Sequence, residues 1–195
     1  MKKVRFGCEK LTNLTKEIGQ LSGLKELVLS NNKNLRVLPK ELWQLKNLKI
    51  ISIYGAGLTV LSKEIGNLSA LEKLGLTWNQ NLMAVPAEIG QLKKLKILSL
   101  AYCNLTALPK EIGNLSGLTD LDLAGNKNLR SLPKEIGELT NLKTLNLEDC
   151  KNLTALPNEI ENLTNLKQLD LSKTKISVAE KTKIKQMLPN CKITE

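Results

Sequence analysis

The hydrophobic positions of this chain recur with a period of 23 or 24 residues. Each unit begins with the pattern Leu-x-x-Leu-x-Leu or a close variant and ends in a segment close to Leu-Pro-x-Glu-Ile-Gly-x-Leu. The first leucine of each unit stands at position 24, 48, 71, 95, 118, 142 or 166, so the spacings are 24, 23, 24, 23, 24 and 24 residues. A repeat of this length predicts a solenoid, in which stacked units share one continuous core.

The fifth unit shows how each repeat is expected to fold. Leu121 and Leu123 alternate with polar residues, which is the period of a half-buried β-strand. Pro133 has the fixed φ angle and the missing N–H donor that suit the start of a helical turn. We expect that turn to bury Ile136, and we expect Gly137 to loosen or end it.

Two near-identical segments carry a resemblance to a known family. Leu-Pro-Lys-Glu-Ile-Gly-Asn-Leu at 108–115 and Leu-Pro-Lys-Glu-Ile-Gly-Glu-Leu at 132–139 resemble the leucine-rich repeat family. The resemblance implies an α/β repeat solenoid: a horseshoe with a parallel β-sheet on the concave face, short helical turns on the convex face, and terminal caps. It also implies a non-enzymatic module for protein–protein interaction. Similar arrays are common in bacterial surface or secreted proteins, so an extracellular or cell-surface location is favoured, with a cytoplasmic one left open.

The repeat and its flanks predict one single domain in three parts. Residues 1–23 form the expected N-terminal cap and half repeat, residues 24–176 hold about seven units, and residues 177–195 form a C-terminal helical cap. Ser177 and Glu180 have the spacing of a capping box at the start of that helix. We expect the chain to be complete at both ends. We expect no membrane span, because no apolar run approaches the roughly 20 residues that one requires.

Composition argues against catalysis and metal binding. The sequence contains no histidine, so it lacks the usual general base of hydrolases and the commonest metal ligand. Its four cysteines, Cys8, Cys103, Cys150 and Cys191, lack the spacing of a metal motif. Cys103 and Cys150 occupy equivalent places two rungs apart, about 10 Å, which is beyond the reach of a disulfide. We therefore expect free thiols, no catalytic residue, no metal site and no cofactor.

The ninth position of the unit is predicted to form a buried polar ladder. A side-chain amide there can satisfy backbone groups at the turn between rungs. Ala56 and Thr174 depart from this pattern and predict locally weaker turns. The ladder consists of Asn32, Asn79 and Asn126, with Cys103 and Cys150 replacing the asparagine in two other units.

The side chains that flank the buried leucines of each strand are expected on the concave face. Three of the five aromatic residues of the chain, Tyr54, Trp78 and Tyr102, fall there in neighbouring units, beside Ile50 and Ile97. Large rigid side chains among small residues are typical of a binding hot spot. The alternative is that the aromatic rings pack on one another and stiffen the inner sheet.

The later units place acidic residues on the same face: Asp120, Asp122, Glu148, Asp149 and Asp170. The chain as a whole has a formal net charge of +10, yet this face is net negative. The contrast favours a basic protein or peptide as the partner, with the aromatics as anchors, and argues against nucleic acid in the groove. Two alternatives are a solvated polar surface and a Ca²⁺ site, although no compact ligand loop is present.

Three functions remain open from the sequence. The leading interpretation is a protein-interaction module that binds a protein or peptide through its concave face. A glycan-binding surface protein would use Tyr54, Trp78 and Tyr102 as stacking platforms. A protein that binds an anionic polymer or membrane would use its basic convex side. The sequence leaves the oligomeric state open, and we favour a monomer.

Overall fold

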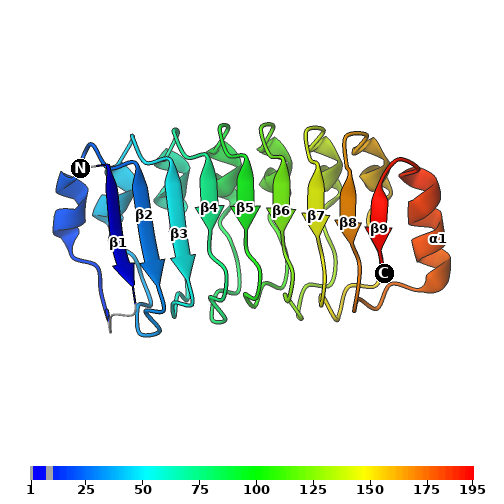
Figure 1. Ribbon diagram of the computed structural model, residues 1–195, viewed down its shortest axis with the longest axis horizontal. Helices are drawn as coiled ribbons and strands as arrows, with labels where there is room; N and C mark the ends of the chain where they lie inside the picture. The colour runs from blue at the N-terminus through cyan, green and yellow to red at the C-terminus, as the bar shows by residue number, and fades with distance from the viewer. Residues whose placement is uncertain (1, 8–10) are drawn as a thin grey trace.

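The computed structural model describes residues 2–7 and 11–195, and the expectations for Cys8 lie outside the described residues. The described residues form one parallel sheet, in which each strand pairs with the next along the chain (Figure 1). Its strands are β1 Lys3–Gly7, β2 Glu26–Ser30, β3 Ile50–Tyr54, β4 Lys73–Gly75, β5 Ile97–Ser99, β6 Asp120–Asp122, β7 Thr144–Asn146, β8 Gln168–Asp170 and β9 Lys192–Thr194. One turn of 3-10 helix follows each strand from β1 to β7, and α1 follows β8. These are η1 Lys16–Gln20, η2 Lys40–Gln44, η3 Lys63–Asn67, η4 Ala87–Gln91, η5 Lys110–Asn114, η6 Lys134–Glu138, η7 Asn158–Asn162 and α1 Val178–Met187.

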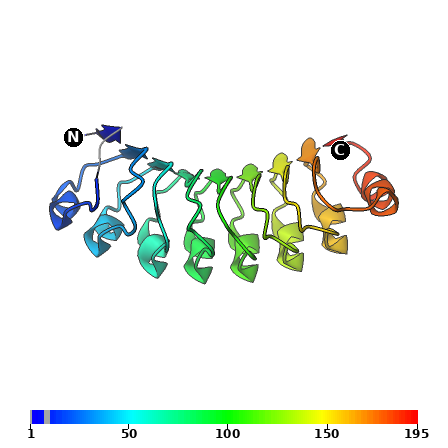
Figure 2. The same ribbon diagram turned by 90° about the horizontal axis from the view of Figure 1, so that it is seen from below.

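The sheet and the helical turns form the two layers of a shallow arc (Figure 2). The strands line its concave side and the 3-10 turns line its convex side. The predicted fold class, an α/β repeat solenoid with a parallel sheet on the concave face and short helical turns on the convex face, is confirmed. No helix in the described part of the chain combines the length and the apolar character that crossing a bilayer requires.

The core consists of columns of equivalent apolar residues between the two layers. The strands pair in register, so that Leu74 lies beside Leu98 and Leu98 beside Leu121. All three are almost completely buried. A single unit leaves one side of each leucine exposed, so the neighbouring unit must cover it. Each Å² of apolar surface that this removes from water stabilises the fold by about 25 cal/mol.

The glycine of the helical turns has a different role from the expected one. η6 continues through Gly137 to Glu138, so the expectation that Gly137 ends the turn is wrong, and its loosening of the turn stays a prediction. A Cβ atom on Gly137 would lie 2.4 Å from the backbone oxygen of Glu159 in the next turn. The residue is glycine because stacked turns approach too closely for a side chain. In η2 the equivalent residue is Trp43, which is 2% exposed and fills this part of the core instead.

The buried ladder at the ninth position forms as predicted. The Asn79 amide donates to the carbonyl oxygens of Ile53 and Leu76, at 2.9 and 2.7 Å. Its oxygen accepts from the N–H of Leu58 at 3.4 Å. The thiol of Cys103 takes over one of these bonds and donates to the oxygen of Leu76 at 3.2 Å. The predicted free thiols are confirmed for the three described cysteines, Cys103, Cys150 and Cys191.

Additional strands and a helix lie at the two ends of the repeat array. At one end β1 pairs with β2, and at the other β9 pairs with β8 beside α1 (Figure 1). The hydroxyl oxygen of Ser177 accepts from the N–H of Glu180 at 3.2 Å, which caps α1. Ile184 and Leu188 are buried, and α1 packs against η7. The repeat pattern does not predict β1 and β9, because neither segment carries the Leu-x-Leu signature.

Candidate functional site

The eighth residue of each unit, which follows its strand, has a left-handed backbone. Its φ angle lies between 53° and 70° in all seven units. In the first six units its N–H continues the hydrogen-bond ladder beyond the strands: Trp78 donates to the oxygen of Ala101 at 2.9 Å, and Tyr102 to the oxygen of Ala124 at 2.6 Å. Bonds of this kind hold the conformation whatever the side chain. The seven residues are Asn31, Gly55, Trp78, Tyr102, Gly125, Asp149 and Lys173.

Trp78 and Tyr102 are unusual occupants of this position. Glycine adopts a left-handed backbone without penalty and asparagine tolerates it, but a bulky residue there is an outlier. The conformation costs about 1–2 kcal/mol per residue. Strain held by surrounding hydrogen bonds at an exposed position is characteristic of functional sites.

The two aromatic rings form a stack at the ends of β4 and β5. The ring centroids of Trp78 and Tyr102 lie 4.4 Å apart, and the ring planes differ by 9°. The far side of Tyr102 rests on Gly125, where a Cβ atom would lie 2.4 Å from the ring. Trp78 is 39% exposed and Tyr54 is 44% exposed. The structure therefore brings two of the three predicted aromatics into contact and leaves much of the third open to solvent.

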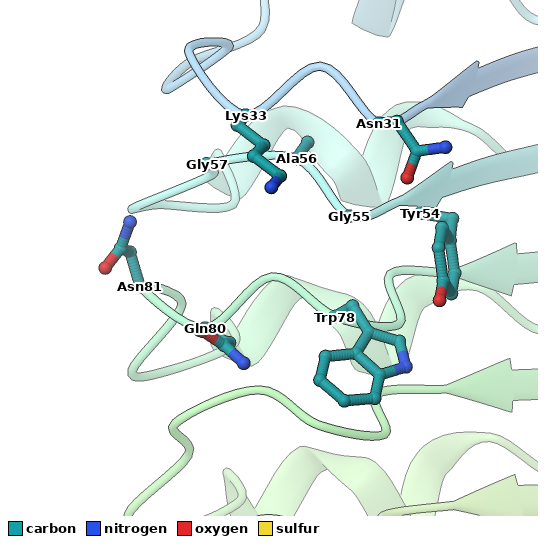
Figure 3. A pocket seen from close by; sticks show the side chains of 9 residues that line it. All are labelled: Asn31, Lys33, Tyr54, Gly55, Ala56, Gly57, Trp78, Gln80 and Asn81. Atoms are coloured by element: carbon teal, nitrogen blue, oxygen red, sulfur yellow. The ribbon is translucent and has the colours of Figure 1, made fainter. Parts of the chain in front are cut away.

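A recess separates Tyr54 from Trp78 (Figure 3). Its volume is about 450 Å³, and Lys33 and Gln80 lie on its two sides. It exists because the second unit is one residue shorter than its neighbours. In the longer units a turn closes after the ninth residue, as in the bond from the N–H of Leu35 to the oxygen of Asn32 at 2.9 Å. The second unit has no such turn. Its Gly57 packs so closely on the backbone of Lys33 that a Cβ atom there would clash with the Lys33 oxygen.

A second recess lies beside the fourth unit, which is also one residue short. Its volume is about 360 Å³, and Tyr102, Asn104 and Lys127 lie along it. Trp78 and Gln80 line both recesses. The alternation of 24 and 23 residues therefore produces two hollows along one edge of the concave face, with the aromatic stack between them.

The two isoleucines are not part of this aromatic cluster. Ile50 and Tyr54 stand at opposite ends of β3, about 13 Å apart at 3.3 Å per residue. The strand pairing places Lys73 between Ile50 and Ile97. The predicted group of five residues therefore divides in two. Tyr54, Trp78 and Tyr102 form what we call the aromatic edge, and the two half-buried isoleucines lie on either side of Lys73.

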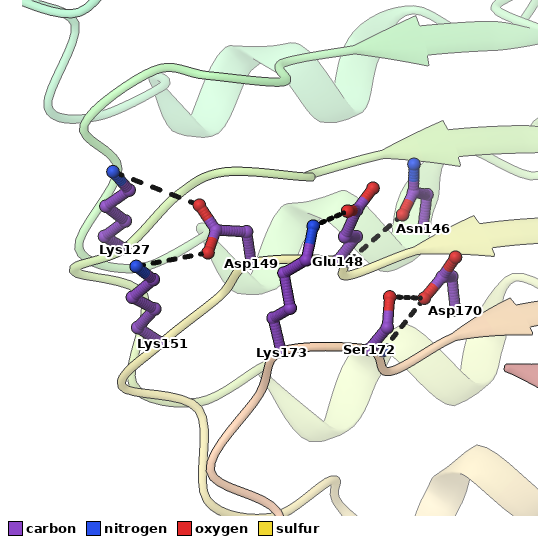
Figure 4. A network of polar contacts seen from close by, with 8 residues as sticks. All are labelled: Lys127, Asn146, Glu148, Asp149, Lys151, Asp170, Ser172 and Lys173. Atoms are coloured by element: carbon purple, nitrogen blue, oxygen red, sulfur yellow. Dashed lines mark hydrogen bonds and ion pairs between the residues drawn. The ribbon is translucent and has the colours of Figure 1, made fainter. Parts of the chain in front are cut away.

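Two of the five acids of the predicted acidic zone, Glu148 and Asp149, form ion pairs with lysines (Figure 4). A carboxylate oxygen of Glu148 lies 2.6 Å from the Lys173 ammonium, and this hydrogen bond raises the pKa of Lys173. Asp149 lies between Lys151 at 3.5 Å and Lys127 at 4.0 Å. These lysines stand on neighbouring turns, so the zone is an ion-paired network with less net charge than its acids alone would give.

The aspartates of the strands also have structural roles. Asp122 accepts a hydrogen bond from the N–H of Ala124 at 3.2 Å, and Asp170 accepts from the N–H of Ser172 at 2.9 Å. Asn146 makes the same contact in the unit between them. Asp120 accepts from the hydroxyl of the neighbouring Thr119 at 2.7 Å. The acids therefore support the backbone beyond each strand as well as lining the concave face.

The geometry offers little for catalysis or for a metal. Within residues 2–7 and 11–195 no group of three or more acidic or cysteine side chains is arranged to hold a metal ion. Burial raises the pKa of the Cys103 thiol to about 11 and that of Cys150 to about 12. Both thiols are therefore protonated at neutral pH and are poor nucleophiles.

Two family models match the sequence. A model of a leucine-rich repeat region matches residues 83–190, and a model of a single leucine-rich repeat matches residues 23–45. The chain belongs to the leucine-rich repeat family. Leucine-rich repeat proteins generally act as non-enzymatic modules for protein–protein interaction. No curated protein matched this leucine-rich repeat sequence.

Solved structures of leucine-rich repeat proteins share the fold. The leucine-rich repeat domain of the type III effector XopL is 26% identical with a TM-score of 0.74, over 98% of this chain and 75% of that domain. The plant peptide hormone receptor RGFR1, in complex with RGF2, is 24% identical with a TM-score of 0.70, over 100% of this chain and 37% of the receptor. The ectodomain of the Arabidopsis thaliana receptor kinase GASSHO1/SCHENGEN3, in complex with CASPARIAN STRIP INTEGRITY FACTOR 2, is 25% identical with a TM-score of 0.63. That match covers 84% of this chain and 23% of the ectodomain chain.

Proposed function

We propose that this leucine-rich repeat protein binds a protein or peptide partner through its concave face, with Tyr54, Trp78 and Tyr102 as anchors. The observation that carries the proposal is the stacked pair of Trp78 and Tyr102 on a strained backbone, in which Trp78 is exposed and Tyr102 holds it from behind. A fold that needed only a turn at these two places would be more stable with glycine, as at Gly55 and Gly125. The strain is compensated if the rings contribute binding energy.

The shape of the aromatic edge supports a protein or peptide ligand. Tyrosine and tryptophan offer large contact areas at a small cost in side-chain entropy, and such residues dominate binding energy at interfaces. The Trp78 ring is already held by Tyr102, so little further ordering is required on binding.

The acidic residues of β6 and β8 extend the proposed interface. Asp120, Asp122 and Asp170 are half-buried on the concave face, with Glu148 and Asp149 beside them. They would steer a basic segment of the partner toward this end of the sheet, mainly through the rate of association. The GASSHO1/SCHENGEN3 ectodomain, which shares the fold, is itself in complex with CASPARIAN STRIP INTEGRITY FACTOR 2.

Glycan binding receives less support from the geometry. A stacking platform for a sugar needs an open ring face. One face of Tyr102 is covered by Trp78 and the other lies on Gly125. Only Tyr54 and the outer side of Trp78 remain for a sugar ring on this part of the concave face.

Affinity capture with two baits tests the proposal. The first bait is the wild-type protein, and the second carries Tyr54→Ala, Trp78→Asn and Tyr102→Asn, since asparagine is the natural residue at the equivalent Asn31. Mass spectrometry should identify partners that only the wild type retains. A control bait, Val60→Ala, removes an apolar side chain that is 54% exposed in the same unit as Tyr54. Equal capture by all three baits would remove the aromatic edge from the interface.

A further inference from the structure

We propose, resting on the proposed function, that the two recesses bind one peptide segment in the polyproline II conformation, with prolines three residues apart. The first recess lies between Tyr54 and Trp78, and the second lies beside Tyr102. The segment crosses the Trp78 ridge between them and places one proline ring in each recess.

The distance between the recesses selects this conformation. They are associated with the second and fourth units, so they lie two rungs apart, or about 10 Å. In an extended β-strand, side chains on one face recur about 7 Å and about 13 Å apart, and neither value matches. A polyproline II helix has three residues per turn and rises about 9 Å over them, so residues i and i+3 share a face at the required distance.

The walls of the recesses suit proline. Grooves lined by aromatic side chains are the usual receptors for polyproline II segments, because the ring of proline packs on their faces. Trp78 lines both recesses and so contacts both prolines: its uncovered face is available in the first, and in the second the proline meets the edges of the stacked Trp78 and Tyr102 rings. A polyproline II backbone makes no internal hydrogen bonds, so its carbonyl groups need external donors. The amides of Gln80, Asn81 and Asn104 lie along the recesses and can donate to them.

The charges at the recesses favour acidic residues next to the prolines. The described residues that line the recesses include Lys33 and Lys127 and no carboxylate. The ion pair between the Lys127 ammonium and the Asp149 carboxylate is a long one, at 4.0 Å. The favoured segment is therefore of the type Glu-Pro-x-x-Pro-Glu. The acidic residues of β6 and β8 belong to later units and contact a different part of the partner.

A series of peptides tests the spacing directly. Three labelled peptides of equal length and composition carry two prolines separated by two, three or four positions, each proline flanked by glutamate. We expect the peptide with prolines three positions apart to bind at least tenfold more tightly than the other two. The chain has two tryptophans, and Trp43 is 2% exposed, so a Trp43→Phe protein reports binding through Trp78 alone. Fluorescence anisotropy of the label provides an independent reading.

Changes in loop length test the recesses themselves. Inserting one residue after Ala56 gives the second unit the length of its neighbours and closes the first recess, so the preference for the three-position peptide should disappear. An insertion after Cys103 should do the same at the second recess. The control inserts one residue after Thr174, where the step from Leu171 to Ile176 is as short as that from Ile53 to Leu58 but lies outside both recesses. If an insertion prevents folding, Gln80→Trp is the alternative variant. Residue 80 is exposed and lines both recesses, so a tryptophan there should fill them and lower the affinity for the three-position peptide at least tenfold.

The outcomes separate this inference from the proposed function. Equal affinity for the three peptides, or tight binding that survives both insertions, overturns the inference. Absence of binding to every peptide also overturns it, while the proposed function stands if the aromatic triple variant loses a captured protein. If that variant also retains every partner, both proposals fail.

Discussion

The ring of Tyr102 lies against the α-carbon of Gly125 in the following unit. A Cβ atom on Gly125 would be 2.4 Å from Cδ1 of the tyrosine. A similar relationship joins Asn31 to Gly55, where a Cβ atom would lie 3.0 Å from the asparagine oxygen. Side chains at the eighth position therefore lean over the next unit, where Tyr102 meets a glycine and Trp78 stacks on the ring of Tyr102.

Gly125→Ala should displace the Tyr102 ring and destabilise the fold by about 1–2 kcal/mol, because it adds a side chain at a φ angle of 70° as well as a clash. Chemical denaturation measures the stability, and Trp78 fluorescence reports the broken stack. Gly75→Ala is the matched control, since its Cβ atom would meet nothing closer than 3.8 Å. Equal effects of the two substitutions would contradict the relationship between Tyr102 and Gly125.

Trp78→Asn should leave the free energy of unfolding within about 1 kcal/mol of the wild type. The substitution loses an aromatic contact worth about 0.5–1.5 kcal/mol. It also relieves backbone strain of about 1–2 kcal/mol, because asparagine tolerates a positive φ angle. Urea denaturation measures the difference. A decrease in the free energy of unfolding of more than 2 kcal/mol would mean that the stack mainly stabilises the fold. The strained backbone would then no longer support a binding role for Trp78.

Asn79→Ala should cost about 2–3 kcal/mol, because it leaves the carbonyl oxygen of Ile53 without its buried amide donor and the oxygen of Leu76 with the Cys103 thiol in place of two donors. Asn79→Cys should cost less, since the thiol of Cys103 makes the equivalent bond in the next unit. Thermal denaturation of the two variants gives the order. A cysteine variant that is no more stable than the alanine variant would show that the thiol bond contributes nothing.

The buried thiols should make the protein less stable at high pH. Folding raises the pKa of Cys103 from 9.0 to about 11 and that of Cys150 from 9.0 to about 12. Above pH 9 the unfolded chain therefore loses protons that the folded chain retains, and the stability present below pH 9 declines as pH rises toward 11 and 12. The decline is at most about 1.4 kcal/mol per pH unit and thiol.

A double variant with Cys103→Asn and Cys150→Asn is the control for this prediction, since asparagine is the residue of the other ladder positions. The difference in stability between the two proteins should change between pH 8 and pH 11. Lysine and tyrosine titrate in both proteins and cancel in the comparison. A constant difference would show that the thiols are not responsible for the decline.

Much of the fold was predictable because each unit repeats the same rule. The alternation at Leu121 and Leu123 and the turn after Pro133 define one rung, and the period defines the stack. The ladder at Asn79 was equally readable, because a buried amide in a turn has few other uses. β1 and β9 were not readable, since they extend the sheet by backbone pairing without the leucine pattern.

The candidate site was only partly predictable. The side-chain pattern identified Trp78 and Tyr102 but grouped them with Ile50 and Ile97, although the four residues from Ile50 to Tyr54 already correspond to about 13 Å along a strand. The left-handed backbone was also missed, although glycine at Gly55 and Gly125 is a signal for it. The recesses follow from differences in unit length, which change the shape of the surface without changing any core residue.

This last property has an evolutionary consequence. A recess arises where a unit loses one residue after its ninth position, and the leucines on both sides of that place keep their register. Gain or loss of a single codon therefore opens, closes or moves a pocket along the array, with no substitution in the core. Ligand preference in such a protein can diversify through small insertions and deletions in its loops while the core stays unchanged.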